Sequence, residues 1–131
     1  MSKEVVTASP DTTLPDAHAL LKQRGIRRLP VVDRGKLVGI VTLGDIREAS
    51  PSDATSLSIY EVHYLLSKLK VREIMTKAPI TVTTSDTIRE AAQVMLEHKI
   101  AGLPVMEGGK LAGIITESDL FRALVEEPEE D

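Results

Sequence analysis

The sequence contains no cysteine and no tryptophan, and its aromatic residues are confined to Tyr60, Tyr64 and Phe121. The absence of cysteine excludes disulfides, thiolate catalysis and cysteine-based metal sites, and it favours a cytoplasmic protein. No apolar run reaches the roughly 20 residues that a transmembrane helix needs, and no signal peptide opens the chain. We therefore expect an aliphatic core and no contact with a membrane.

A cluster of charges of one sign, all negative, occurs at the C-terminus. The formal net charge is -4, yet Glu and Asp occupy every one of the last six positions except Pro128. Without these five of its 20 acidic residues, the chain has 15 acidic residues and 16 Lys and Arg, so their charges nearly balance. We predict that residues 125–131 form a disordered acidic tail on a nearly neutral body. The scarcity of aromatic residues disfavours nucleic-acid binding, which combines a basic surface with stacking side chains.

The sequence repeats itself at an offset of 74 residues (104 - 30). Leu29-Pro30-Val31 recurs as Leu103-Pro104-Val105, and residues 1–49 align without a gap to residues 75–123. A unit of about 50 residues buries too little apolar surface to be stable alone. The two copies must therefore support one another.

Both copies predict the same order of elements. In the first, a β-branched run at 5–8 predicts a strand, and a capping box that begins at Thr13 predicts a helix. Strands at 29–32 and 37–41, joined by a tight turn, follow, and a second helix begins after Thr42. The repeating unit is thus strand, helix, strand, strand, helix, which is an α+β arrangement.

The predicted boundaries follow from this repeat. Residues 1–49 form the first repeat, 50–70 a linker with a helix, 71–124 the second repeat and 125–131 the tail. The second copy has a lead-in at 71–75, whereas the first copy begins at Met1 and has none. This difference suggests that the chain was cut from a longer protein.

The repeat order, the Leu-Pro-Val strand and the Gly-Ile-x-Thr-x-x-Asp junctions at 39–45 and 113–119 resemble the CBS domain. Two copies resemble the tandem CBS pair, or Bateman module. The resemblance implies an α/β-type CBS fold in which pseudo-twofold repeats pack through their sheets and leave two clefts. It also implies a homodimer formed through helices. The linker at 49–70 is similar to that of bacterial CBS proteins associated with acetoin utilisation.

The resemblance further implies a regulatory sensor rather than an enzyme. Such a module needs no cofactor; it binds AMP, ADP, ATP or S-adenosylmethionine, and it regulates an attached or separate effector domain. A module that only dimerises and binds no small molecule remains the alternative. The residues themselves show no paired nucleophile and base, and His18, His63 and His98 lack metal-ligand spacing.

Two threonine–aspartate pairs are the candidate binding groups. Thr42 and Thr116 stand at predicted helix starts, where unpaired backbone N–H groups suit phosphate oxygens. Asp45 and Asp119 match the ribose position of the family, because a carboxylate accepts hydrogen bonds from vicinal hydroxyls. The same spacing also forms an ordinary helix cap, so both interpretations stay open.

By position, the adenine pocket of the family corresponds to Thr7, Ala8, Arg27, Arg28, Leu29 and Pro30 in the first copy, and to Thr81, Val82, Ile100, Ala101, Gly102, Leu103 and Pro104 in the second. Arg27 and Arg28, with Arg24, Arg34 and Lys36 nearby, favour phosphate unless they are merely solvated. In the second copy Glu117 would repel a phosphate. We therefore predict a phosphate-bearing ligand in the first cleft, and an empty second cleft or a less charged adenosine compound there.

Overall fold

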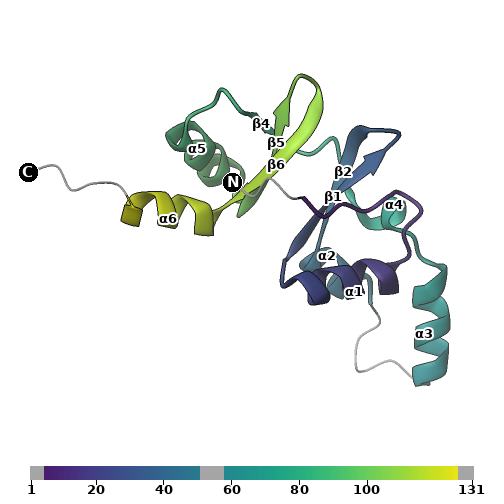
Figure 1. Cartoon of the computed structure of the whole chain (residues 1–131). Helices are drawn as coiled ribbons and strands as arrows, with labels where there is room; N and C mark the ends of the chain where they lie inside the picture. The colour runs from purple at the N-terminus through teal and green to yellow at the C-terminus, as the bar shows by residue number, and fades with distance from the viewer. Residues whose placement is uncertain (1–4, 51–57, 127–131) are drawn as a thin grey trace, which may run out of the picture. The chain divides into compact units, whose positions relative to one another are not determined.

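The computed structural model describes residues 5–50 and 58–126, and Figure 1 shows the order of its elements. Most of the predicted tail (127–131) and part of the predicted linker (51–57) lie outside the described residues. The chain divides into two compact units. One unit comprises Val6–Pro79, and the other comprises Met1–Val5 with Ile80–Asp131.

In the described residues the first unit has a three-stranded sheet and four helices. Strand order is β1-β2-β3, with both neighbouring pairs antiparallel. The predicted strand at 5–8 is reduced to a single parallel bridge between Ala8 and Val31, and a strand that the sequence did not predict, β3, closes the sheet. In chain order the elements are α1 (Leu14–Arg24), β1 (Arg28–Asp33), β2 (Lys36–Thr42), α2 (Leu43–Ala49), α3 (Ile59–Lys68), α4 (Val71–Ile74) and β3 (Thr76–Lys77).

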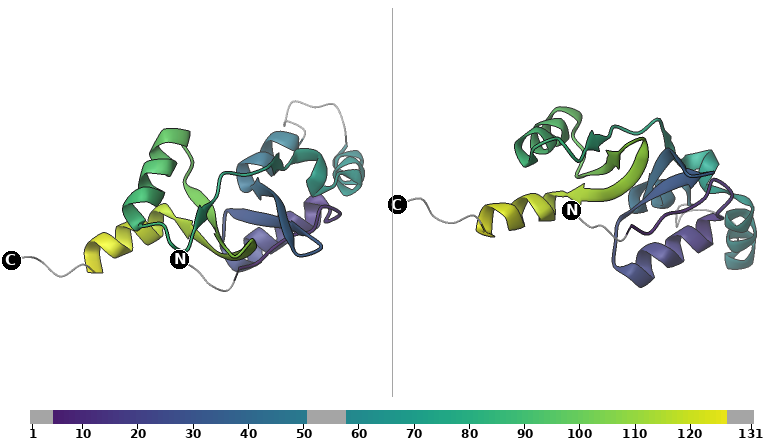
Figure 2. Two further views of the ribbon diagram at one scale, coloured as in Figure 1. Left: turned by 90° about the horizontal axis from the view of Figure 1, so that it is seen from above. Right: turned by 45° about the horizontal axis from the view of Figure 1, so that its top comes forward.

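The second unit follows the predicted order of the repeat. It contains β4 (Val82–Thr83), α5 (Ile88–His98), β5 (Gly102–Glu107), β6 (Lys110–Thr116) and α6 (Glu117–Glu126). Strand β4 is parallel to β5, and β5 is antiparallel to β6. Figure 2 shows from two sides that α5 and α6 lie on the same side of the β5–β6 hairpin. Helix α6 includes Val125 and Glu126, which the sequence analysis assigned to the tail.

The duplication extends to individual backbone interactions. The bridge between Ala8 and Val31 recurs 74 residues later as the pairing of Val82 with Val105. Both hairpins have a register shift at the same place, after Val31 and after Val105. Strands β2 and β6 also have identical burial patterns. These matches confirm the α+β repeat that the sequence predicted.

Each unit has its own aliphatic core, and among the described residues the first core also includes residues from outside its sequence repeat. Val71 of α4 is fully buried there. The backbone holds it in place, because Val71 donates to the Thr12 carbonyl at 2.8 Å and Leu14 donates to the Leu69 carbonyl at 3.1 Å. The lead-in to the second sequence copy thus packs into the first unit. Leu14 is 1% exposed, whereas Ile88 at the equivalent position is 52% exposed.

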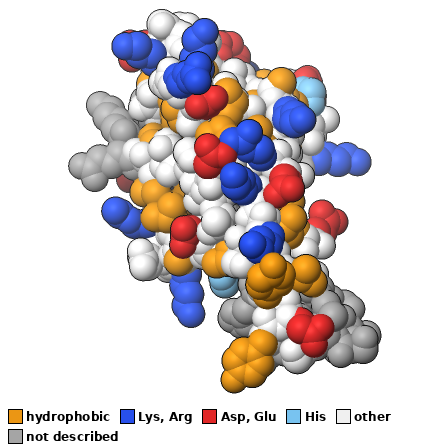
Figure 3. All heavy atoms as spheres, turned by 90° about the vertical axis from the view of Figure 1, so that its right-hand side faces the viewer, with side chains coloured by type: hydrophobic (Ala, Val, Ile, Leu, Met, Phe, Trp, Pro, Cys, Tyr) orange, Lys and Arg blue, Asp and Glu red, His pale blue; other side chains and the backbone are white. Residues whose placement is uncertain are grey.

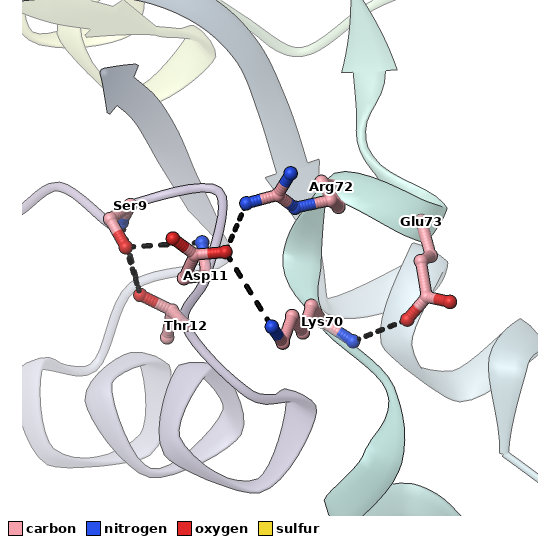
Figure 4. A network of polar contacts seen from close by, with 6 residues as sticks. All are labelled: Ser9, Asp11, Thr12, Lys70, Arg72 and Glu73. Carbon is pink, nitrogen blue, oxygen red and sulfur yellow. Dashed lines mark hydrogen bonds and ion pairs between the residues drawn. The ribbon is translucent and has the colours of Figure 1, made fainter. Parts of the chain in front are cut away.

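A polar network joins the segment before α1 to the start of α4 (Figure 4). The Asp11 carboxylate accepts a hydrogen bond from Arg72 and lies 3.7 Å from the Lys70 ammonium. These side chains are exposed, so their ion pairs add little stability. The backbone bond from Arg72 to the Pro10 carbonyl, 3.1 Å long, supports the same connection. The network therefore mainly fixes the direction in which the chain enters α4.

Candidate functional site

Three arginines meet at a hollow of ≈ 480 Å³ in the first unit. The hollow lies where the loop before β1, the end of β2 and the start of α2 come together. Its size falls within the range of small-molecule pockets, about 300–1,000 Å³. Its lining residues are Arg27, Arg28, Thr42, Leu43, Gly44 and Arg47. The structure therefore brings three predicted site residues together, namely Arg27, Arg28 and Thr42.

The backbone around the hollow is tied by short hydrogen bonds. Leu43 donates to the Arg27 carbonyl at 2.8 Å, which joins the arginine loop to the start of α2. Thr42 N–H donates to Asp45 Oδ2 at 2.8 Å, and Asp45 N–H donates to Thr42 Oγ1 at 3.1 Å. The predicted capping box is therefore present. It uses one oxygen of Asp45 and leaves Oδ1 without a donor from the described part of the chain.

The positive charge of the site comes from guanidinium groups. Helix α2 has seven residues, and the phosphate role predicted for Thr42 at its start stays a prediction. Guanidinium groups form paired, charge-assisted hydrogen bonds with phosphate oxygens. Arg27 and Arg47 are exposed at the hollow and Arg28 is partly buried. An anionic ligand would thus meet two exposed guanidinium groups and one from a partly buried residue.

Arg47 is not among the site residues that the sequence predicted. It follows Leu43 and Gly44 by four and three residues, a spacing that places side chains on one face of a helix. A search of the α2 face for cations would have found it. Arg34 and Lys36, in contrast, do not join the site, because they lie in or beside the turn between β1 and β2. The turn is five residues from Arg28 along β1, or about 16 Å at 3.3 Å per residue.

The predicted adenine-pocket residues of the first copy are mostly internal. Leu29 and Pro30 are fully buried, and Ala8 is nearly so. Ala8 donates to the Pro30 carbonyl at 3.0 Å, and Val32 donates to the Ala8 carbonyl at 2.8 Å. Thr7 alone among the non-arginine members is exposed. An adenine contact by the buried members would have to come through their backbone, and their assignment stays a prediction.

The second unit carries the same threonine–aspartate pair in different surroundings. Asp119 Oδ2 accepts from Thr116 N–H at 2.9 Å and from Thr116 Oγ1 at 3.3 Å. Asp119 Oδ1 accepts from Arg122 Nη1 at 2.8 Å. Sequence analysis also missed this arginine, although an acid and a base three residues apart on a helix are neighbours.

The hollow of the second unit is apolar and lies between α5 and α6. Its volume is ≈ 800 Å³, and its lining includes the predicted site residues Ile100 and Ala101, together with Glu117. Neither Thr116 nor Asp119 lines it. Gly102, Leu103 and Pro104 are buried in β5, and Val82 is buried in β4. Thr81 is exposed. The two repeats therefore present surfaces of different chemistry.

Other functional classes gain no support from the described ranges, 5–50 and 58–126. Within them no group of three or more His, Asp or Glu is placed to hold a metal. Nor does any helix there have the length and apolar character to cross a bilayer. On the face drawn in Figure 3, basic and acidic side chains are interspersed, so that face carries no continuous basic stripe for a polyanion.

Comparison with known proteins agrees with this geometry. The model of the CBS domain family matches residues 1–52 and 71–126. A CBS domain-containing protein of Dictyostelium discoideum is 39% identical over 127 residues, which cover 95% of this chain and 88% of that protein. The inosine-5'-monophosphate dehydrogenase of Korarchaeum cryptofilum is 38% identical over 120 residues, or 91% of this chain. The chain spans only 22% of that enzyme's length.

Two solved structures of this kind contain adenosine compounds. The CBS domain pair of protein MJ0100, in complex with 5-methylthioadenosine and S-adenosyl-L-methionine, matches with a TM-score of 0.78 at 31% identity and covers 95% of this chain and 91% of that one. CBSX2, in complex with AMP, matches with a TM-score of 0.75 at 33% identity and covers 93% and 88%. The chain belongs to the CBS domain family, as a tandem pair of CBS domains.

Proposed function

We propose that this chain is a regulatory module that senses an adenosine-containing ligand, and that its first repeat binds one carrying a phosphate. The observation that carries the proposal is the meeting of Arg27, Arg28 and Arg47 at one hollow that Thr42 also lines. Asp45 does not line this hollow itself, but it is bonded to the Thr42 amide. The complexes of MJ0100 and CBSX2 with adenosine compounds support the ligand class. The charge of the hollow supports the phosphate.

The parts of such a ligand have separate partners in this proposal. The guanidinium groups bind the phosphate, and Asp45 Oδ1 accepts from the ribose hydroxyls, because its other oxygen already receives the Thr42 amide at 2.8 Å. A ligand with different affinities for two conformations of the module shifts their populations, and this shift passes to the effector. The relatives named above do not carry a description of acetoin utilisation, so this process remains a lead from the linker alone.

A thermal-shift screen tests the sensor directly. A ligand that binds the folded state raises the apparent Tm, and at 100 times its Kd it stabilises by about 2.7 kcal/mol. We expect AMP to raise the Tm and adenosine to raise it less, because adenosine lacks the group that the arginines bind. Arg47→Gln should weaken AMP binding by about tenfold, the loss of roughly one charge-assisted hydrogen bond.

The control is Arg24→Gln, which removes the same charge from an exposed arginine outside the hollow. It should leave AMP affinity unchanged, so that a general effect of net charge is separated from the site. Absence of any shift with AMP, ADP, ATP, adenosine and S-adenosylmethionine would reject the sensor function.

A second proposal concerns assembly. The groove between α5 and α6 is lined mainly by apolar side chains, and several of these are strongly exposed, among them Leu96 at 79% and Phe121 at 64%. Monomeric proteins rarely leave such a patch uncovered. We propose that this face joins two copies of the chain in a homodimer. A module that only assembles would use this face and bind no nucleotide.

Leu96→Glu tests the dimer. A carboxylate in an apolar interface lacks a partner, so we expect the dimer to dissociate at least tenfold more readily. Sedimentation velocity over a range of concentrations measures this change. Leu65→Glu, on the exposed face of α3, is the matched control and should leave the dimer intact. A wild-type chain that is monomeric at all concentrations contradicts the proposal, as does a Leu96→Glu dimer of unchanged affinity.

A further inference from the structure

The two ribose-binding candidates differ in how many acceptor positions they have free. An ionised carboxylate offers about four acceptor positions, two on each oxygen. Asp45 receives one donor, the Thr42 amide, from the described residues. Asp119 receives three, namely the Thr116 amide, the Thr116 hydroxyl and Arg122. A ribose diol donates two hydrogen bonds, so Asp45 has room for it and Asp119 does not.

Arg122 is the charged donor that a ligand can displace. Its guanidinium lies 2.8 Å from Asp119 Oδ1, and its side chain is 66% exposed whereas that of Asp119 is 13% exposed. The Thr116 amide is part of the helix start and cannot leave without unwinding it, whereas the Thr116 hydroxyl can rotate away. The residue equivalent to Arg122 in the first repeat is Glu48, whose charge has the opposite sign and cannot donate to Asp45. One of the two extra donors, the Thr116 hydroxyl, has a threonine counterpart in Thr42, so the difference in charged donors arises from one position of the repeat.

We infer that Arg122 masks the second repeat, because its ion pair with Asp119 must open before a ribose can bind there. This inference rests on the proposed function, whose regulation it extends. It makes Arg122 a specificity-determining residue that acts through Asp119. The first repeat can bind the ligand without breaking an ion pair. The second repeat can bind one only when the Arg122–Asp119 ion pair opens.

Adenosine is the probe that isolates the mask, because it has the diol and no phosphate. In a background of Asp45→Asn, which disables the first repeat, Arg122→Ala should strengthen adenosine binding by about two- to fivefold, the range of an ion pair with one exposed partner. Arg122→Lys retains a donor and should stay close to the background value. Isothermal titration calorimetry measures all three affinities.

Two further measurements exclude a merely structural effect. 2'-Deoxyadenosine donates one hydrogen bond fewer to the carboxylate, so Arg122→Ala should strengthen its binding less than that of adenosine. In the wild-type background, Glu48→Arg introduces the mask into the first repeat and should weaken adenosine binding by about two- to fivefold. Glu48→Gln, which removes the charge without adding a guanidinium, should not.

The outcomes separate the inference from the function beneath it. If adenosine compounds bind the wild-type chain and Arg122→Ala leaves the second repeat unchanged or still unable to bind, the masking is refuted while the sensor stands. If no adenosine compound binds any variant, the proposed function fails and the inference fails with it. Equal gains for adenosine and 2'-deoxyadenosine also refute the masking, since the mask acts through the diol.

Discussion

Replacing Asp45 by alanine should weaken AMP binding by at least about 100-fold. Hydrogen bonds to a charged group contribute about 1.5–3 kcal/mol each, and the two from a ribose diol would both be lost. Asp45 Oδ1 faces no donor from the described residues, whereas Oδ2 is held by the Thr42 amide at 2.8 Å. Isothermal titration calorimetry with AMP gives the affinity of each variant.

Asp45 also caps α2, so the effect on binding must be separated from an effect on folding. Asp45→Ala removes the cap and should cost about 1 kcal/mol of stability. Asp45→Asn retains an oxygen that can accept from Thr42 N–H, and it should weaken AMP binding with little loss of stability. Asp119→Ala is the positional control, and it should change AMP affinity far less. Equal losses from Asp45→Ala and Asp119→Ala would contradict the asymmetry between the repeats.

The sequence predicts most of the fold because the duplication checks each local pattern twice. Thr13 and Thr87 both accept from the backbone N–H of the acid three residues on, at 3.4 and 3.1 Å, and both helices end at a residue with positive φ, Gly25 or Lys99. Such caps and turns depend on a few neighbouring residues. Patterns of this kind are readable without any tertiary information.

What the sequence does not show is where the segments after the linker pack. Val71 looks like the start of the second copy, yet it is buried in the core of the first unit, and β3 pairs with β2. A two-residue strand has no periodicity that could identify it. Its pairing with a strand some 35 residues away depends on the tertiary fold, which no local pattern records.

The candidate site, too, has residues that the sequence predicted and residues that it did not. Arg27, Arg28 and Thr42 were predicted from the motif and do meet at one hollow. The role of Arg47 depends on which face of α2 meets the arginine loop, which no local pattern records. The pairing of Arg122 with Asp119 is a local spacing of three residues, but its counterpart Glu48 occupies the same helical position in a repeat of the same fold, so the repeat itself does not predict it. The two repeats thus differ in side-chain chemistry at single positions of a duplicated backbone.

Replacing Gly39 by alanine should lower the free energy of unfolding by about 2 kcal/mol, within the range for overpacked interiors. A Cβ atom at this position would lie 2.5 Å from Met75 Sδ and 2.9 Å from the Thr76 carbonyl oxygen. The methionine side chain can move, but the carbonyl belongs to β3, which pairs with β2 at Gly39 and Ile40. The strand must therefore shift, and chemical denaturation monitored by circular dichroism measures the loss.

Gly44→Ala is the matched control, because it adds the same methyl group in the same unit. There the new Cβ meets only Thr42 Oγ1 at 3.6 Å, an ordinary contact, and alanine favours the helix by about 1 kcal/mol over glycine. Gly44→Ala should therefore be neutral or stabilising. A Gly39→Ala chain as stable as the wild type would show that β3 does not hold its place on β2 in solution. The lead-in to the second copy would then not be part of the first unit.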